Sequence, residues 1–422
     1  MTEASTLRRV VLASFIGTAI EWYDFFLYGT AAALVFNKLF FPDFEPATGT
    51  ILAFATYSVG FFARPLGGVV FGHYGDKVGR KSVLVITLTL MGVSTFLVGA
   101  LPTYSSIGVA APILLVVLRF VQGFGVGGEW GGAVLMAVEH SPKGKRGLSA
   151  SWPQAGVPAG LLLSTGVFSA FALLPEDQFL SWGWRCPFLI GILLVGVGLF
   201  IRLRVMESPI FATLQETKRT ARMPIVDVLR SHMRNVLLAM GARFAENVSF
   251  YVSSVFILSY AGAAFKGVTL RAISIAAAVE LLTIPMFGAL SDRLGRRPVY
   301  MLGAALTGLF AFPFFWLVDT HTALGITLAA VLGLGLAHAA MYGPQAAFFS
   351  ELFGTSVRCT GASLGYQLAS PLAGGLAPLI ATWLLKLTDG QPWPVALYVI
   401  ATSLLTLVSL YLAAETSRAE LS

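Results

Sequence analysis

Long apolar runs constrain the fold of this chain more than any other feature of its sequence. Each run has about 20 residues or more, the length that a helix needs to cross a lipid bilayer. The runs begin near residues 10, 50, 83, 109, 148 and 186 and, in the second half, near residues 235, 271, 298, 323, 359 and 393. Hydrophobic residues make up 56% of the 422 residues and charged residues 12%, which leaves no room for an independent soluble domain. Because a backbone in lipid must satisfy its own hydrogen bonds, we predict an all-α integral membrane protein with twelve transmembrane helices in two six-helix bundles.

The longest polar insert lies at mid-chain and separates the runs into two sets of six. We predict an N-terminal six-helix bundle over residues 1–205, a cytoplasmic linker over 206–234 and a C-terminal six-helix bundle over 235–422. Most of the 28 lysines and arginines fall on one side of the membrane when the runs are threaded in order, and this excess marks the cytoplasmic side. We therefore expect a multi-pass protein of the cell (inner) membrane with cytoplasmic N- and C-termini and no cleaved signal peptide.

Two patterns of charged residues occur in both halves of the chain. The segment Phe71–Lys81 recurs 216 positions later as Phe287–Arg297. A Glu followed seven residues later by an Arg also occurs once in each half. Secondary transporters use two halves of equal orientation to bind a substrate between them, so we expect the repeated charges to latch the cytoplasmic side. The alternative is a pair of basic loops that only obey the charge rule. The predicted latch residues are Asp76, Arg80, Lys81, Glu139, Arg146, Asp292, Arg296, Glu351 and Arg358.

Ionisable side chains inside membrane helices are costly, so each one is a candidate functional group. The predicted helices contain Glu21, Asp24, Arg64, Arg119, Glu129, Arg243, Glu246, Glu280 and His338. Asp24 and Arg119 lie at compatible depths in the first and fourth helices, so their side chains are able to meet. An acid that loses its arginine to a substrate changes its proton affinity, which suits proton coupling. The alternatives are a permanent ion pair and, for His338, a neutral hydrogen-bonded imidazole. The predicted proton-coupling residues are Asp24, Arg119, Glu21 and His338.

Arg64 stands at mid-helix with no acidic residue within one helical turn, so a carboxylate from elsewhere must compensate its charge. A substrate carboxylate is the simplest source, because a guanidinium binds a carboxylate through two parallel hydrogen bonds. In the seventh helix a polar and aromatic stripe from Arg243 to Tyr251 follows one face, which is unsuited to lipid. The alternative is that Arg243 and Glu246 neutralise each other and only pack between helices. The predicted substrate-binding residues are Arg64, Arg243, Glu246, Asn247, Tyr28, Trp152, Gln154, Tyr251, Tyr342, Gln345 and Gln367.

The segment Phe71–Lys81 is similar to the signature between the second and third helices of the major facilitator superfamily. Further segments narrow this resemblance to one branch: Glu21–Gly29, Ala63–Gly68, Arg119–Gly123, Gly127–Gly132 and Trp182–Arg185. They resemble the metabolite:proton symporter family, which includes shikimate, α-ketoglutarate, citrate and proline/betaine transporters. The resemblance covers essentially the whole chain and implies proton-coupled uptake by alternating access. Asp24 and Arg119 also resemble an acid and an arginine of proton-coupled sugar transporters in the superfamily.

The resemblance and the intramembrane charges together predict a secondary active transporter that takes up a small organic acid with protons. Shikimate or a related carboxylate is the first choice of substrate. A dicarboxylate, a tricarboxylate or a zwitterionic osmolyte such as betaine or proline is the alternative substrate, and proton-driven export is the alternative direction. Outside transport, the alternative is a ligand-sensing receptor with a transporter fold.

Nothing in the sequence indicates an enzyme, a metal site or a cofactor. Cys186 and Cys359 fall at opposite predicted membrane faces, so they form neither a disulfide nor a metal site. The run Gly123–Gly128 matches G-x-G-x-x-G but lies inside a predicted membrane helix with no preceding strand, which argues against a dinucleotide site. The expected partners are a small-molecule organic acid or metabolite, protons and the lipid bilayer, without nucleic acid, and we expect a monomer.

Overall fold

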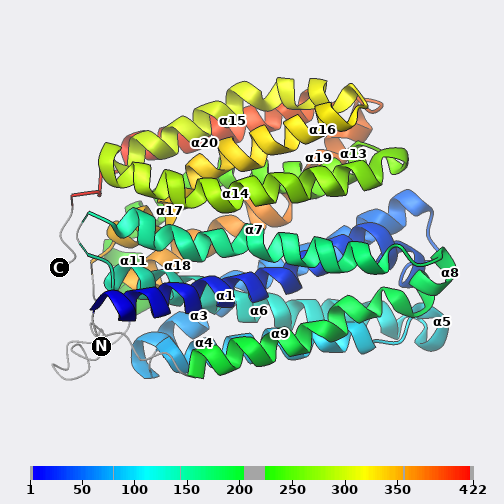
Figure 1. The fold of residues 1–422 in the computed structure, drawn as a ribbon, viewed down its shortest axis with the longest axis horizontal. Helices are drawn as coiled ribbons and strands as arrows, with labels where there is room; N and C mark the ends of the chain where they lie inside the picture. The colour runs from blue at the N-terminus through cyan, green and yellow to red at the C-terminus, as the bar shows by residue number, and fades with distance from the viewer. Residues whose placement is uncertain (1–2, 79, 143, 204–223, 355–356, 419–422) are drawn as a thin grey trace.

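The computed structural model describes residues 3–78, 80–142, 144–203, 224–354 and 357–418, and within these ranges the regular elements are all helices. The longest helices run side by side along the molecule (Figure 1). The first helix begins and the last helix ends at the same end of the bundle, which we call the terminal end; the opposite end is the distal end. An even number of passes across the bundle gives this arrangement.

The first half of the chain contributes six passes. α1 (Glu3–Ala31) continues through the π-helical η1 (Ala32–Phe36) into α2 (Asn37–Leu39). The other passes are α3 (Pro46–Val78), α4 (Arg80–Ala100), α6 (Ala110–Glu139), α7 (Arg146–Phe171) and α9 (Arg185–Leu203). Short elements join them at the distal end: α5 (Tyr104–Ile107), α8 (Glu176–Gln178) and the π-helical η2 (Phe179–Gly183).

The second half contributes six more passes after the short α11 (Pro224–Ser231). Three are uninterrupted: α14 (Lys266–Leu294), α15 (Arg296–Asp319) and α20 (Trp393–Leu412), with the 3₁₀ turn η4 (Ala263–Phe265) before α14. The other three contain π-helical turns, a feature frequent at functional sites. They are α12–η3–α13 (Met233–Tyr251, Val252–Phe256, Ile257–Tyr260), α16–η5–α17 (Ala323–Ala330, Val331–His338, Ala339–Glu351) and α18–η6–α19 (Arg358–Ala369, Ser370–Gly375, Ala377–Leu387). The predicted twelve-helix membrane fold is confirmed; most of the predicted linker lies outside the described residues.

Most of these passes are apolar enough to cross a membrane by composition alone. Nine described helices meet that test, and the bent pair Glu176–Gly183 and Arg185–Ile201 makes a tenth. α3 and the α12–α13 pass are equally long but more polar, and they carry the buried Arg64 and Arg243. A membrane helix that carries a buried arginine belongs in the interior of a bundle, where other helices shield its charge from lipid.

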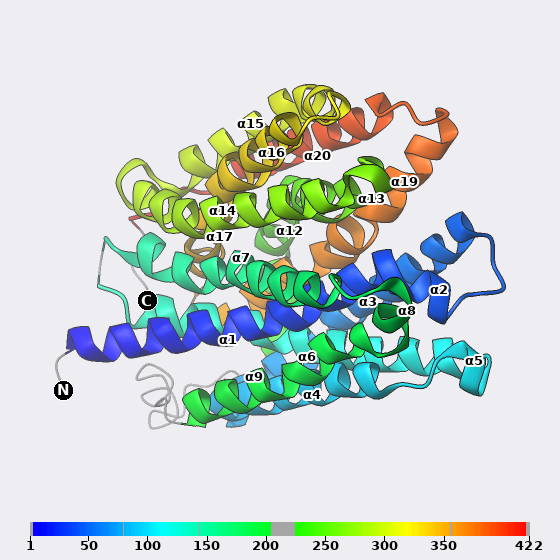
Figure 2. The same cartoon turned by 45° about the vertical axis from the view of Figure 1, so that its right-hand side comes forward.

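α7 lies between α1 of its own half and α14 of the other half (Figure 2). At the terminal end α7 and α14 touch through glycines. A Cβ atom on Gly147 would lie 2.4 Å from the carbonyl oxygen of Gly288, and one on Gly288 would lie 2.7 Å from that of Gly147. The two halves therefore meet backbone to backbone at this end, which only glycine permits.

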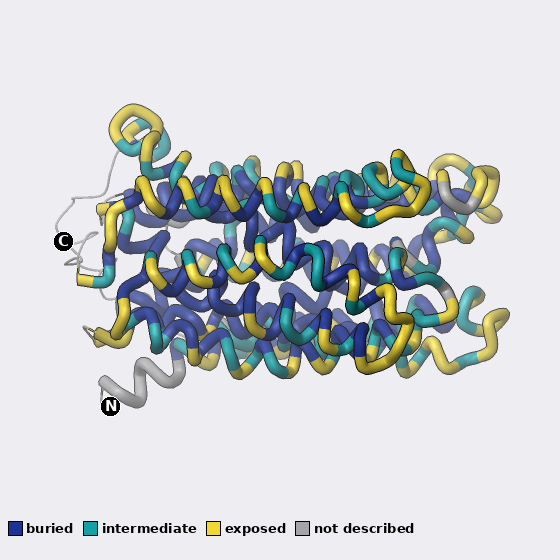
Figure 3. The backbone as a smooth tube through the Cα atoms, turned by 90° about the horizontal axis from the view of Figure 1, so that it is seen from above, coloured by how far each residue is buried: buried dark blue, intermediate teal, exposed yellow. Residues whose placement is uncertain are grey.

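The outward faces of the bundle carry the exposed residues, whereas the central faces of the helices are buried (Figure 3). Large apolar side chains are among the most exposed, such as Leu309 at 79% and Leu282 at 73%. In water such side chains would be an aggregation hazard, but in a bilayer they face acyl chains. The buried polar and charged residues form the candidate site at the centre.

Candidate substrate and proton site

The two halves enclose a small central cavity. Its lining comes from both: Trp22, Val157, Arg243, Glu246, Asn247, Phe250, Tyr251, His338, Tyr342 and Tyr366. The cavity volume is about 10 Å³, which is close to the smallest space that holds one water molecule. A ligand of several carbon atoms would therefore fit there only if the halves moved apart.

On the first-half side, two arginines are buried among aromatic rings. The Arg64 guanidinium carbon lies 4.3 Å from the ring centre of Phe25 and 4.6 Å from that of Phe61. The Arg119 guanidinium carbon lies 4.2 Å from Phe25 and 4.4 Å from Tyr28, whose hydroxyl donates to Thr56. Both arginines are at most 1% exposed.

Neither Arg64 nor Arg119 forms an ion pair with any carboxylate in the described ranges of the chain. Nε and Nη2 of Arg64 and Nη2 of Arg119 are buried without a hydrogen-bond partner there. A buried cation without a counter-ion is costly, and the surrounding rings compensate only part of that cost. The pair therefore forms a ready site for an anion.

Asp24 is not the direct partner of Arg119 that the depth argument suggested. Arg119 Nη1 donates to Gln122 at 2.6 Å, and Gln122 donates in turn to the hydroxyl of Thr95 at 2.6 Å. Asp24 lies against Thr95 and Gly191, where a Cβ on Gly191 would be 3.2 Å from its Oδ1. Asp24 thus sits between α1, α4 and α9, inside the first half, and Glu21, one turn earlier, is also buried.

On the second-half side, the buried charges are joined in one network. Arg243 pairs with Glu246 at 3.2 Å and donates to the backbone oxygen of Tyr366 at 2.6 Å. Glu246 also contacts Nε2 of His338 at 3.2 Å, and Nδ1 of His338 contacts Glu280. The sequence predicts every member of this network to be an ionisable residue inside a membrane helix, but it assigns no partner to Glu280.

Other predicted binding residues support this network or the seam between the halves. Asn247 accepts from Arg243, Gln345 donates to Glu246 and to Tyr300, and the hydroxyls of Tyr342 and Tyr366 lie 3.3 Å apart. Across the seam, Trp130 stacks on Tyr366 at 3.8 Å, and Gln367 donates to the Gly127 carbonyl. Within the first half, Trp130 also donates to Gln154. Tyr251 packs edge-on against Phe61.

The predicted binding residue Trp152 lies away from the site. Its side chain is 39% exposed and packs on Phe15.

The predicted latch lies at the terminal end. Glu351 binds Arg296 at 3.2 Å and Arg146 of the other half at 3.8 Å. Asp292 accepts hydrogen bonds from the backbone of Gly147 at 2.8 Å and Leu148, so it caps α7 of the other half, where the helix dipole favours an anion.

The remaining predicted latch residues have other surroundings. Lys81 donates to the backbone oxygen of Leu203, and Arg358 donates to those of Ser350 and Phe353. Glu139 is half-buried at the end of α6. The side chains of Asp76 and Arg80 lie outside the described residues.

Glu415 and Thr416, which sequence reasoning missed, complete the latch. Glu415 accepts from the backbone of Arg296 at 2.9 Å and of Arg297 at 3.0 Å, and Thr416 donates to Glu351. Burial opposes ionisation of Glu415, but these backbone donors prevail and hold the pKa of its carboxyl below the ordinary value. No periodic signal marks an acid that caps a helix about 120 residues earlier in the chain.

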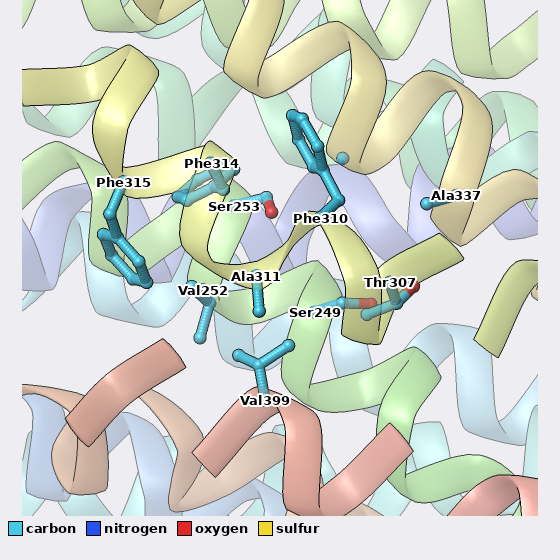
Figure 4. A pocket seen from close by; sticks show the side chains of 11 residues that line it. Ser249, Val252, Ser253, Thr307, Phe310, Ala311, Phe314, Phe315, Ala337 and Val399 are labelled. Atoms are coloured by element: carbon cyan, nitrogen blue, oxygen red, sulfur yellow. The ribbon is translucent and has the colours of Figure 1, made fainter. Parts of the chain in front are cut away.

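Other hollows lie outside the central site. An apolar pocket of about 20 Å³ lies within the second half, lined by residues such as Phe310, Phe314 and Val399 (Figure 4). At the distal end an open groove of about 610 Å³ separates η1, α2 and the end of α7 from α14 and carries Lys38, Glu176, Lys266 and Arg271. The terminal end is therefore closed by the latch, whereas the distal end is grooved between the halves.

Comparison with known proteins identifies the family. The family model described as Major Facilitator Superfamily matches residues 14–355 and 236–421. The chain belongs to the major facilitator superfamily. It is 43% identical to the shikimate transporter of Escherichia coli (strain K12), with 98% of this chain and 96% of that protein covered. It is 35% identical to the proline/betaine transporter of the same strain, with 96% and 82% covered.

Solved structures share the fold. The proton:xylose symporter XylE bound to 6-bromo-6-deoxy-D-glucose superposes with a TM-score of 0.77 at 17% identity, covering 98% of this chain and 97% of that one. These findings confirm the resemblance drawn from the motifs. The protein is a membrane-embedded secondary transporter for a small molecule and is not an enzyme.

Proposed function

We propose that this protein takes up a small organic acid, such as shikimate or a related carboxylate, together with protons. The observation that carries the proposal is the pair of buried arginines, Arg64 and Arg119, that have no carboxylate partner in the described chain. An anionic substrate would supply the missing charge. Each guanidinium has buried N–H groups without acceptors, and a carboxylate accepts from such a group through short, charge-assisted hydrogen bonds.

The two cations are close enough to act on one substrate. Both lie within 4.3 Å of the centre of the Phe25 ring, so their mutual repulsion adds to the cost of leaving the site empty. Aromatic rings around them offer flat apolar surfaces for a cyclic carbon skeleton. The rings of Tyr28 and Tyr57 lie beside Arg119, and their hydroxyls would serve substrate hydroxyl groups.

The shikimate transporter of Escherichia coli supports this substrate class by its 43% identity. Two cations would also suit a dicarboxylate. The likeness to a proline/betaine transporter keeps a zwitterion as the second candidate, with its carboxylate bound at the arginines.

We propose that the terminal end faces the cytoplasm, with both termini there and the latch acting as the cytoplasmic gate. The excess of lysine and arginine in the predicted loops on that side supports this orientation. We also keep the proposed division into residues 1–205, a linker over 206–234 and residues 235–422, with one chain as the transporting unit.

Uptake into proteoliposomes tests the proposal. Labelled shikimate, α-ketoglutarate, citrate and betaine are offered in parallel with an inward proton gradient and without it. We expect shikimate to accumulate only with the gradient, and Arg64→Gln to slow accumulation strongly at low shikimate concentration while the exposed control Arg230→Gln preserves it. Accumulation of betaine in place of the acids would overturn the substrate class. Equal uptake with and without the gradient would overturn the coupling.

A further inference from the structure

We propose that the transported proton is held in the second half, by the chain Glu246–His338–Glu280, and that Asp24 only positions the arginine site. This inference rests on the proposed proton-coupled uptake and names the groups that carry the proton. We call these three side chains the imidazole chain. It lies in α12, η5 and α14, and its members are at most 4% exposed.

The hydrogen-bond arithmetic of the imidazole chain requires a bound proton. Nδ1 of His338 contacts Glu280, and Nε2 lies 3.2 Å from Glu246. A neutral imidazole carries one N–H and can donate to only one carboxylate. Both contacts are satisfied only if the imidazole is protonated or if one carboxylate is protonated. The chain therefore holds one proton more than a neutral imidazole between two carboxylates.

The charge balance of the second half depends on the same proton. Arg243 supplies one positive charge, and Glu246 and Glu280 supply two negative charges. With the extra proton the buried set is neutral; without it, one negative charge remains buried, which is costly. Oε2 of Glu280 is buried without a partner in the described structure and so remains available to accept a proton.

Other titratable or charged groups around His338 come from every packed helix. They are Arg243 and Glu246 of α12, Glu280 of α14, Tyr300 of α15 through Gln345, Tyr342 of α17 and Tyr366 of α18. The rings of Phe250 and Tyr342 lie 5.0 and 5.1 Å from the imidazole and line the central cavity with it. Glu280 is thus the acid that faces His338 without an arginine of its own.

The imidazole chain borders the cavity between the halves, whereas Asp24 does not. His338, Glu246 and Arg243 line that cavity together with Trp22, whose ring lies 5.2 Å from the Arg64 guanidinium. Separation of the halves on either side would bring water to the chain next to the substrate site. Asp24 lies between helices of one half, so rocking of the halves leaves its surroundings in place.

The proposed step transfers one proton and changes no other bond. Water on the outer side protonates the chain while the distal end is open, and the substrate anion binds at Arg64 and Arg119. After the terminal end opens, the anion and the proton leave to the cytoplasm, and the empty carrier returns. Substrate exchange at equal pH needs no net proton movement, so it separates substrate binding from proton coupling.

The test compares His338→Gln and Glu280→Gln with Asp24→Asn in proteoliposomes, with shikimate as the probe. Each variant is measured for gradient-driven accumulation, for exchange at equal pH and for proton influx reported by an internal pH dye. At one proton per anion, accumulation by the wild-type protein reaches at most about tenfold per pH unit by mass action. His321→Gln, an exposed histidine outside the site, is the matched control.

We expect His338→Gln and Glu280→Gln to lose shikimate-dependent proton influx and to bring accumulation to about onefold, while exchange persists. Asp24→Asn is expected to keep proton influx even if its uptake is slower. Loss of proton influx in Asp24→Asn with retention in His338→Gln would overturn the inference. If His338→Gln also loses exchange at equal pH, Glu280→Gln is tested by exchange and by proton influx. Retained exchange without proton influx in Glu280→Gln would support the inference, and retained proton influx would overturn it. Wild-type protein that never accumulates shikimate would instead overturn the proposed function.

Discussion

The two halves of this transporter hold buried arginines in opposite electrostatic settings. In the first half, Arg64 and Arg119 are surrounded by rings and lack carboxylate partners in the described chain. In the second half, Arg243 is paired with Glu246, Glu246 contacts His338, and His338 contacts Glu280. Halves related by an internal repeat thus differ in what they leave unsatisfied: one lacks an anion and the other needs a proton. In the proposed symport, this difference assigns the anion to the first half and the proton to the second half.

The largest effect is expected from removing Arg243. Arg243→Gln leaves Glu246 buried without its cation, and breaking a buried pair in this way costs about 3–5 kcal/mol. We expect a marked fall in the melting temperature of the detergent-purified protein. Arg64→Gln removes a cation that has no carboxylate partner, so its melting temperature should fall much less. Equal losses in the two variants would contradict the comparison.

Substitution of the first-half arginines, which should lower the melting temperature little, should weaken substrate binding strongly. A hydrogen bond to a charged group contributes about 1.5–3 kcal/mol, so Arg64→Gln and Arg119→Gln should each raise the KM for shikimate by roughly 10- to 150-fold. Arg64→Lys keeps the charge but loses the paired N–H groups, and we expect an intermediate KM. Initial uptake rates over a concentration series measure the change. An unchanged KM in both Gln variants would place the substrate elsewhere.

The contact between the halves at the terminal end should be sensitive to one methyl group. In Gly288→Ala the new Cβ would lie 2.6 Å from the Cβ of Ser151, an overpacking that costs about 1–3 kcal/mol. The closed terminal end should then be less populated. Cys359, which is buried at the start of α18, serves as the reporter in a Cys186→Ser background, and its maleimide labelling should accelerate. Gly166→Ala, where a Cβ meets nothing within 4 Å, is the control and should label at the parent rate.

The smallest effect is expected at Glu415. Its lowered pKa means that its contribution to the latch is complete above the ordinary pKa of about 4.3 and is lost as the pH falls through its value in the folded protein. Glu415→Gln should lower stability by about 1 kcal/mol or less, because the group is half-exposed. The difference in melting temperature between wild type and variant should be constant from pH 8 to 6 and shrink toward pH 4. A difference that grows on acidification would contradict the helix-capping role.

Some features of the site were predictable from the sequence because they depend on one helix. Arg64 has no acidic residue within one helical turn, so the sequence alone predicts that a carboxylate from elsewhere must compensate its charge. Arg243 and Glu246, three residues apart, form the pair that was offered as the alternative to substrate binding. The division into membrane passes was predictable from the apolar runs because each run belongs to a single helix.

Other features depend on neighbours that no local pattern specifies. Asp24 and Arg119 have compatible depths, but Arg119 donates to Gln122, which donates to Thr95, whereas the Asp24 carboxylate lies against Gly191 of α9 and makes no ion pair with Arg119 in the described structure. Trp152 shares a helix with Gln154, yet it packs on Phe15 at the surface while Gln154 accepts from Trp130 at the seam. A single sequence gives the depth of a side chain more readily than its direction.

The sequence by itself determined the membrane fold, the repeat and the identity of the buried charges, because apolar length, spacing and charge cost are properties of single helices. Only the tertiary structure decided which charges meet. His338 contacts Glu246 of α12, 92 residues away in the chain, and Glu280 of α14, 58 residues away. Asp292 caps α7 of the other half by accepting from the backbone of Gly147, 145 residues away. Helix periodicity specifies the face on which a residue lies, whereas the partner on that face is set by how the helices pack.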